Sequence, residues 1–155
     1  MSEIVQFFCP GIPRSQGSKT LGRTKEGRSY MREASGSVHR WRKAVSTAAL
    51  VAFRPRLQPH GGPVAVRLWF TFPPPKSSNH PPYPTKRNGD LDKLTRAVLD
   101  ALTGIVLVDD SAVQWITASK CWGEAPGVHV HVTRAQQDDT DRASGPAVRV
   151  TLEEA

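Results

Sequence analysis

Residues 90–104 read DLDKLTRAVLDALTG, and residues 105–113 continue as IVLVDDSAV. In the first stretch the apolar residues recur at helical spacing, and Gly104 is placed to end the helix. The spacing therefore predicts a helix over residues 90–104, followed by a short apolar run and then a strand. Carboxylates stand at the start of the helix and again at the end of the apolar run.

The rest of the chain divides into strands, one further helix and two long loops. Strands are expected over residues 3–9, 64–72, 113–122 and 128–133, which are rich in β-branched and aromatic residues. A second helix is expected from Ser37, as its N-cap, to about Phe53. The polar segments 12–36 and 76–88 are expected to be long loops. These elements predict an α/β (α+β) single domain, with a small mixed sheet of about four strands packed against two main helices.

The length of 155 residues suffices for one domain with a proper core. No stretch approaches the ~18 consecutive apolar residues of a membrane span, and Glu3 stands where a signal peptide carries positive charge. The two cysteines, Cys9 and Cys121, are too few for a disulfide framework, and we expect both in the core. We therefore expect a cytoplasmic protein with a folded domain over residues 1–134 and a poorly ordered acidic tail over residues 135–155.

Charge is distributed unevenly along the chain, whose formal net charge is +7. Residues 14–56 contain eleven basic and two acidic residues, whereas residues 135–155 contain five acidic and two basic ones. A basic front of this kind favours a polyanionic partner. The alternative, a soluble protein that merely has a basic surface, stays open on charge alone.

The carboxylates around the predicted helix are the strongest chemical signal. Asp90 and Asp92 stand at its start, where two residues at this spacing can still point to one side. Asp109 and Asp110 follow the apolar run, at which point the chain can return towards the helix start. Converging carboxylates form the oxygen-rich site that Mg²⁺ prefers, and a metal beside a basic surface suits hydrolysis of a phosphodiester.

Each carboxylate also has an ordinary structural interpretation. Asp90 or Asp92 could be no more than the cap of the helix. Asp92, Arg96 and Asp100 are spaced four residues apart and could form a surface ion-pair ladder. The segment 109–111 could be a simple turn.

The two quoted stretches resemble the RusA-type Holliday junction resolvases, and the resemblance extends over about residues 4–134. The family pattern is Asp-x-Asp-Asn near a helix start, a Lys one turn later, a Leu-Asp-Ala-Leu run, and an Asp-Asp pair before a strand. Two positions depart from it: Lys93 replaces the asparagine and Arg96 replaces the lysine. Arg96 supplies a fixed positive charge but does not lose a proton near neutral pH, and Lys93 could take over part of that role.

The resemblance implies a homodimer that acts on four-way DNA junctions with Mg²⁺, for which Mn²⁺ can substitute, and that makes paired nicks in DNA recombination and repair. It implies that Asp90, Asp92 and Asp110 are the metal-binding catalytic carboxylates, with Asp109 adjacent and Arg96 at the catalytic basic position. The residues expected to contact DNA are Arg14, Lys19, Arg23, Lys25, Arg28, Lys86, Arg87 and Lys93.

Two other functions remain open at this point. The departure at Arg96 allows a non-catalytic basic DNA-binding protein on the same scaffold, and a nuclease with a broader preference for branched DNA is also compatible. The four tryptophans could stack on unpaired bases or pack in the core: Trp41, Trp69, Trp115 and Trp122. Core packing is favoured for Trp41.

Overall fold

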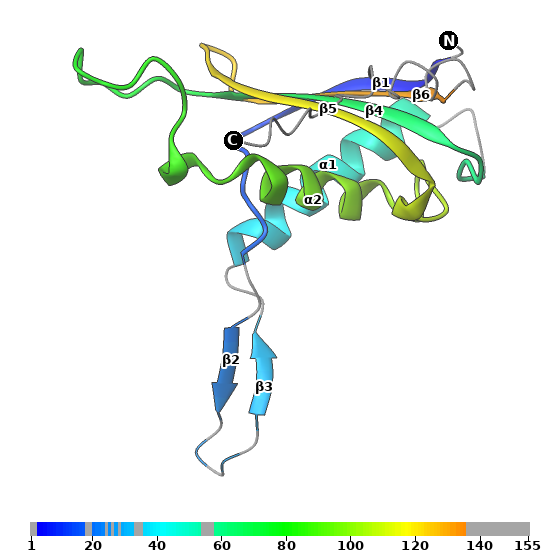
Figure 1. Ribbon diagram of the computed structural model, residues 1–155, viewed down its shortest axis with the longest axis horizontal. Coiled ribbons are helices and arrows are strands. Elements are labelled where there is room, and N and C mark those ends of the chain that lie inside the picture. Colours follow the sequence, from blue (N-terminus) through cyan, green and yellow to red (C-terminus); the bar gives the residue numbers. More distant parts are fainter. Residues whose placement is uncertain are drawn as a thin grey trace, which may run out of the picture.

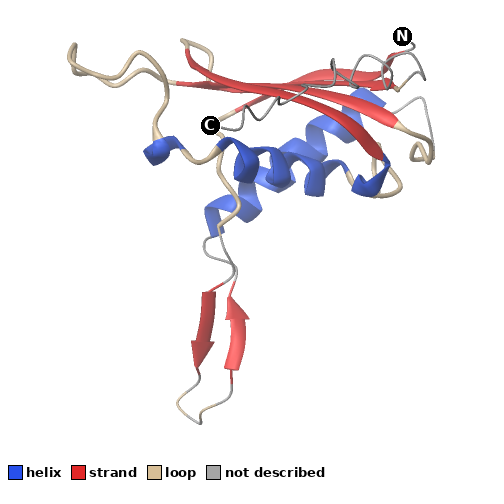
Figure 2. Ribbon diagram, in the orientation of Figure 1, coloured by secondary structure: helices blue, strands red, loops and turns tan. Residues whose placement is uncertain are grey.

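A four-stranded mixed sheet carries two helices on one of its faces (Figures 1 and 2). The computed structural model describes residues 3–17, 20–23, 25, 27, 29–32, 36–53 and 58–135, with the backbone alone over residues 20–23 and 29–32. The α+β architecture predicted from the sequence is confirmed. Among these residues, none of the helices has the length and apolar character that a membrane crossing requires.

The sheet is built around its third strand. In spatial order it contains β1 (Glu3–Pro10), β6 (Gly127–Arg134), β4 (Val64–Phe72) and β5 (Val113–Trp122). Strand β4 pairs antiparallel with β6 and parallel with β5, and β1 pairs antiparallel with β6. Strand β5 is therefore an edge of the sheet. All four strands lie within about two residues of their predicted bounds, because their alternating apolar pattern is a local signal.

The helices α1 (Gly36–Phe53) and α2 (Leu91–Leu102) pack on one face of the sheet, and the core lies between them and β4. Alternate residues of β4 face the helices, and Leu68 and Phe70 are fully buried there. Trp41 of α1 is buried in the same core, as expected. Helix α1 begins at Gly36, so Ser37 lies inside its first turn and is not the N-cap that we expected.

The segment expected to be one long basic loop contains a β-hairpin instead. Strands β2 (Thr20–Arg23) and β3 (Ser29–Arg32) pair antiparallel with each other, and Figure 1 shows them extending away from the sheet and helices. Each of these strands has only four residues, and in the described structure neither pairs with the main sheet. The sequence therefore lacks the longer alternation of apolar and polar residues that predicts a strand packed on a core.

Two smaller expectations also change. The second long loop ends in the short 3₁₀ turn η1 (Lys86–Asn88), directly before α2. Cys9 is buried as expected, but Cys121 is exposed because it lies on the face of β5 that points away from the helices. The predicted acidic tail lies outside the described residues from position 136 onward.

Candidate active site

Asp90 occupies the N-cap position of α2 without acting as a cap. Its backbone is extended, but its side chain makes no capping hydrogen bond. The carboxylate instead accepts a hydrogen bond from the Lys93 ammonium at 3.0 Å. This hydrogen bond and the charge of Lys93 hold the pKa of Asp90 below its ordinary value, with smaller contributions from the charges of Lys86 and Lys120. The capping interpretation therefore does not hold for Asp90, which stays ionised.

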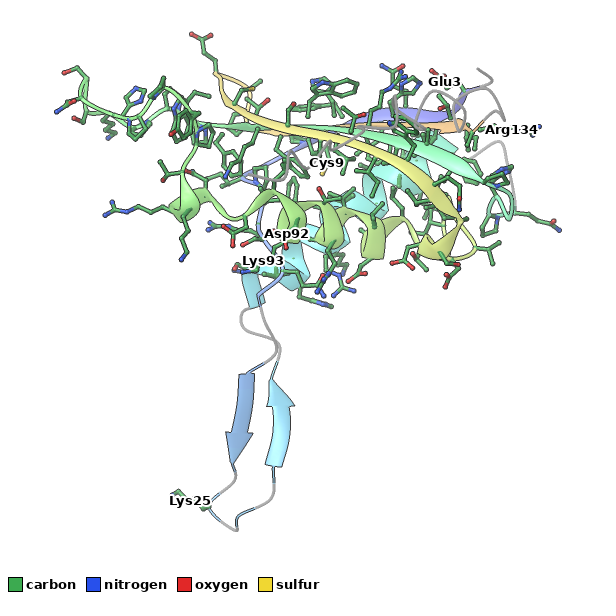
Figure 3. The ribbon with its side chains drawn as sticks, in the orientation of Figure 1. Glu3, Cys9, Lys25, Asp92, Lys93 and Arg134 are labelled. Atoms are coloured by element: carbon green, nitrogen blue, oxygen red, sulfur yellow. The ribbon has the colours of Figure 1, made fainter. Side chains whose placement is uncertain are left out.

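A groove of about 530 Å³ runs between α2 and the edge strand β5. Asp92 and Arg96, one helical turn apart on α2, both line this groove, and so does Asp110. All three side chains are exposed. The apolar part of the lining comes mainly from Leu91, Leu99, Ile116 and Ala118. Two carboxylates and one guanidinium thus share a concave surface, and Figure 3 shows Asp92 and Lys93 on the same first turn of α2.

The two acidic residues after α2 have different roles. Asp109 precedes the 3₁₀ turn η2 (Asp110–Ala112), and its carboxylate accepts a hydrogen bond from the backbone N–H of Ser111 at 2.9 Å. Hydrogen bonding by Ser111, first from its side chain and then from its backbone N–H, lowers the pKa of Asp109. The turn interpretation is therefore correct for Asp109, whereas Asp110 lines the groove.

The surface ion-pair ladder along α2 is not seen. Asp100 pairs instead with Arg42 of α1, whose nitrogen lies 3.7 Å from the carboxylate oxygen. Within the part of the chain that the structure describes, no ion pair joins Arg96 to Asp92 or to Asp100. Asp100 thus links the two helices, and Arg96 remains in the groove with Asp92.

The carboxylates do not by themselves form a complete metal cage. The described residues include no group of three His, Cys, Asp or Glu side chains that could hold a metal ion, so Asp90 does not converge with Asp92 and Asp110 in one chain. Asp92 and Asp110 still provide two oxygen donors in one groove. Mg²⁺ in phosphoryl-transfer sites is usually held by one or two carboxylates together with substrate phosphates and waters. The donor chemistry therefore fits Mg²⁺ bound together with a phosphate.

The N-terminal basic segment touches the start of α2. The backbone N–H of Gln16 donates to the carbonyl of Lys93 at 3.2 Å. Ser15 lies against Gly89, where an added Cβ would come within 2.7 Å of the Ser15 Cβ. Arg14, one of the residues expected to contact DNA, is exposed on this same segment. The segment thus brings positive charge to the end of α2 that carries Asp90.

The other predicted DNA contacts lie around the same end of the molecule or on the hairpin. Lys86 and Arg87 are exposed on η1, just before α2. Lys25 is exposed at the far end of the hairpin (Figure 3). Three predicted contacts have side chains outside the described residues: Lys19, Arg23 and Arg28.

Sequence reasoning missed Lys120 of β5. Its ammonium donates a hydrogen bond to the carbonyl of Gly89 at 2.8 Å and approaches the carbonyl of Thr85 at 3.4 Å. Lys120 pairs in register with the buried Phe70, so it stands on the strand face that looks towards the helices. A lysine at an inward position of an alternating strand was a signal available in the sequence.

The comparison with known families covers this whole region. A family model for the endodeoxyribonuclease RusA matches residues 10–133, which is most of the chain. The match includes α2, both walls of the groove and Lys120. No curated protein matches the chain.

Proposed function

Because the chain belongs to the RusA endodeoxyribonuclease family, we propose that it is a metal-dependent enzyme that resolves four-way DNA junctions by paired nicks, in DNA recombination and repair. The observation that carries this proposal is the groove that Asp92, Arg96 and Asp110 share. Two carboxylates suit a divalent cation, and a guanidinium suits a phosphate, so together they can bind a phosphodiester for hydrolysis.

Asp92 and Asp110 would hold Mg²⁺, or Mn²⁺ in its place. Asp90 would join them only if its carboxylate left Lys93 and moved towards theirs, since the three carboxylates do not converge in this structure. The bound metal supplies a water of lowered pKa and neutralises charge on the phosphate. Arg96 binds a non-bridging phosphate oxygen and stabilises the negative charge that grows there during attack by water. A guanidinium carries a fixed positive charge, so Arg96 acts by electrostatics and moves no proton.

Lys93 prepares Asp90 for this role. Its ammonium lies 3.0 Å from the Asp90 carboxylate, holds it by a hydrogen bond and lowers its pKa. If Asp90 held a metal, the Lys93 ammonium would lose this partner on the first turn of α2, next to Asp92. There it is placed to contact a DNA phosphate, as expected for a basic residue in this position.

A homodimer is part of the same proposal. The groove has an apolar wall in which Ile116 is 45% exposed. In the described part of the chain, β5 is an edge strand with no pairing partner on its outer side. A second copy against this edge would cover apolar surface and bring a second groove to the same junction, as paired nicks require. Ile116→Glu should then yield a monomer in sedimentation, whereas a wild-type monomer would contradict the dimer.

The experiment that tests the function compares synthetic four-way, forked and linear DNA with the full chain, with and without Mg²⁺. Paired nicks in the four-way junction alone, and only with metal, are the expected result. A shifted band without products would favour the non-catalytic DNA-binding protein. Equal cutting of forked and four-way DNA would favour a nuclease of broader specificity.

A further inference from the structure

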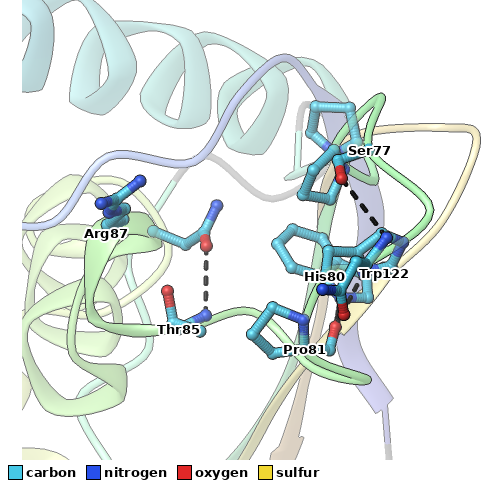
Figure 4. Close-up of a pocket in the computed structure, with 10 residues that line it drawn as sticks. Ser77, His80, Pro81, Thr85, Arg87 and Trp122 are labelled. Atoms are coloured by element: carbon cyan, nitrogen blue, oxygen red, sulfur yellow. Dashed lines mark hydrogen bonds between the residues drawn. The ribbon is translucent and has the colours of Figure 1, made fainter.

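A second cavity, of about 500 Å³, lies beside the candidate active site at the end of β5. It opens between the proline-rich loop that follows β4 and the turn η1 (Figure 4). The lining residues that matter for its chemistry are Asn79, His80, Thr85, Arg87, Asn88 and Trp122. Its volume falls within the range of small-molecule sites and exceeds that of a nucleobase.

Two aromatic rings in this cavity are held in a fixed orientation. The carbonyl of Pro81 accepts a hydrogen bond from the Trp122 indole N–H at 2.9 Å and another from the His80 Nδ1 at 2.8 Å. Since a carbonyl oxygen only accepts, Nδ1 carries the proton of His80. The two rings meet edge to face, with centroids 5.7 Å apart and planes at 81°. An aromatic surface fixed in this way loses little conformational freedom when a flat ligand stacks on it.

Polar groups of several kinds surround these rings. The Asn88 side-chain oxygen accepts a hydrogen bond from the Thr85 backbone N–H at 3.1 Å, which fixes the orientation of its amide (Figure 4). Arg87 contributes an exposed guanidinium to the lining. A fixed amide can read the edge of a base, and a guanidinium can bind the phosphate attached to it.

The cavity and the candidate active site share structural elements. Asn88 stands two residues before Asp90 in the chain. On β5, Trp122 lines the cavity, while Lys120 on the same strand face hydrogen-bonds to Gly89. A nucleotide in the cavity and a phosphate in the groove would therefore lie along the same face of β5, at Trp122 and at Ala118.

We propose that this cavity takes one unstacked base of the branched DNA substrate, stacked on the Trp122 indole with the His80 ring at its edge, and with its phosphate at Arg87. The inference rests on the proposed function and deepens it, since it names a contact that selects where the strand is cut. Bases at a branch point are the easiest to unstack, because they have already lost part of their stacking. Stacking of one base on an aromatic side chain changes affinity by about 5- to 150-fold.

A double-mutant cycle tests this inference: it combines an abasic site in the DNA with a substitution in the protein and measures the affinity for the junction. The full-length Asp92→Asn protein is the parent. An abasic site is placed in turn at each position within a few nucleotides of the crossover of a four-way junction. We expect one position at which the abasic site weakens binding to the parent by about 5- to 150-fold. Adding Trp122→Leu should remove that penalty, whereas the matched control Trp69→Leu, an exposed tryptophan of β4, should retain it.

Trp122 also packs partly against the core, so His80→Ala serves as a second variant that removes the neighbouring ring. It should reduce the same abasic penalty, with thermal melting showing that both variants are folded. If the parent binds the junction, and the abasic site lowers the affinity of every variant by the same factor at every position, the cavity proposal is wrong. If the parent binds no four-way junction, the proposed function fails as well.

Discussion

The Lys120 ammonium donates a 2.8 Å hydrogen bond to the carbonyl of Gly89, the residue directly before Asp90. Lys120 belongs to the edge strand β5, and Gly89 belongs to the short connection between η1 and α2. The same ammonium approaches the carbonyl of Thr85 at 3.4 Å. The sheet thereby fixes the position of the backbone from which Asp90 and the first turn of α2 begin.

Replacing Lys120 should loosen this connection. Lys120→Met keeps most of the side-chain length but removes both hydrogen bonds, and should lower the free energy of unfolding by about 1–2 kcal/mol. Junction cleavage should fall more than junction binding, because the carboxylate is displaced while the basic surface remains. Urea denaturation and a cleavage assay measure the two effects. Ser119→Ala, the exposed neighbour on β5, is the control, and a Lys120 variant that behaves like it would refute the role of Lys120.

Gly89 should tolerate no side chain. Its φ of +101° is a conformation that L-residues rarely adopt, and an added Cβ would come within 2.7 Å of the Ser15 Cβ. Gly89→Ala should therefore destabilise the protein by roughly 1–3 kcal/mol. Gly104→Ala is the matched control, since Gly104 also has a positive φ, of +81°, but a Cβ there meets nothing within 4 Å. If both variants lost the same free energy of unfolding, the contact of the added Cβ with Ser15 would not destabilise the protein.

The two cysteines should react at different rates. Burial raises the pKa of the Cys9 thiol, so the reactive thiolate is scarce near pH 8, whereas Cys121 is exposed. Iodoacetamide should modify Cys121 in the folded protein and reach Cys9 only after denaturation. Mass spectrometry of digested protein assigns the modified residue. Because the folded-state pKa of Cys9 is raised, its protection should weaken as the pH increases, and equal labelling of both thiols at pH 8 would contradict this.

The ion pair between Arg42 and Asp100 should contribute little. Its atoms are 3.7 Å apart, and both side chains keep more than a quarter of their exposure to solvent. Asp100→Asn should change the free energy of unfolding by less than about 1 kcal/mol. Thermal melts at low and high salt measure this, and a loss well above that value at both salt concentrations would show that the pair is a main link between α1 and α2.

Local patterns in the sequence predicted the main elements correctly. The apolar spacing of α2 and the alternation of β4 involve neighbouring residues, so neither depends on knowing the tertiary fold. The ion pair of Asp90 with Lys93 also follows a helical spacing that the sequence displays. The grouping of Asp92 with Arg96 is likewise local, since one turn of α2 separates them.

Tertiary relationships could not be predicted in the same way. The contact of Lys120 with Gly89 requires the parallel register of β4 with β5, which places Lys120 opposite Phe70. The exposure of Cys121 has the same origin, because β5 is an edge strand whose outer face the helices leave uncovered. The hairpin of β2 and β3 gave no signal, since its strands are short and, among the described residues, pair with each other and not with the main sheet.

The central claim is that carboxylates in the α2 groove carry out metal-dependent cleavage, and Asp92→Asn tests it most directly. The variant keeps the size of the side chain and removes the charge that would bind Mg²⁺. With Mg²⁺ and a synthetic four-way junction, we expect Asp92→Asn to abolish the nicks and to retain junction binding. Asp100→Asn, a change of the same kind eight residues along α2, should cleave like the wild type. Cleavage by Asp92→Asn at the wild-type rate would contradict the account.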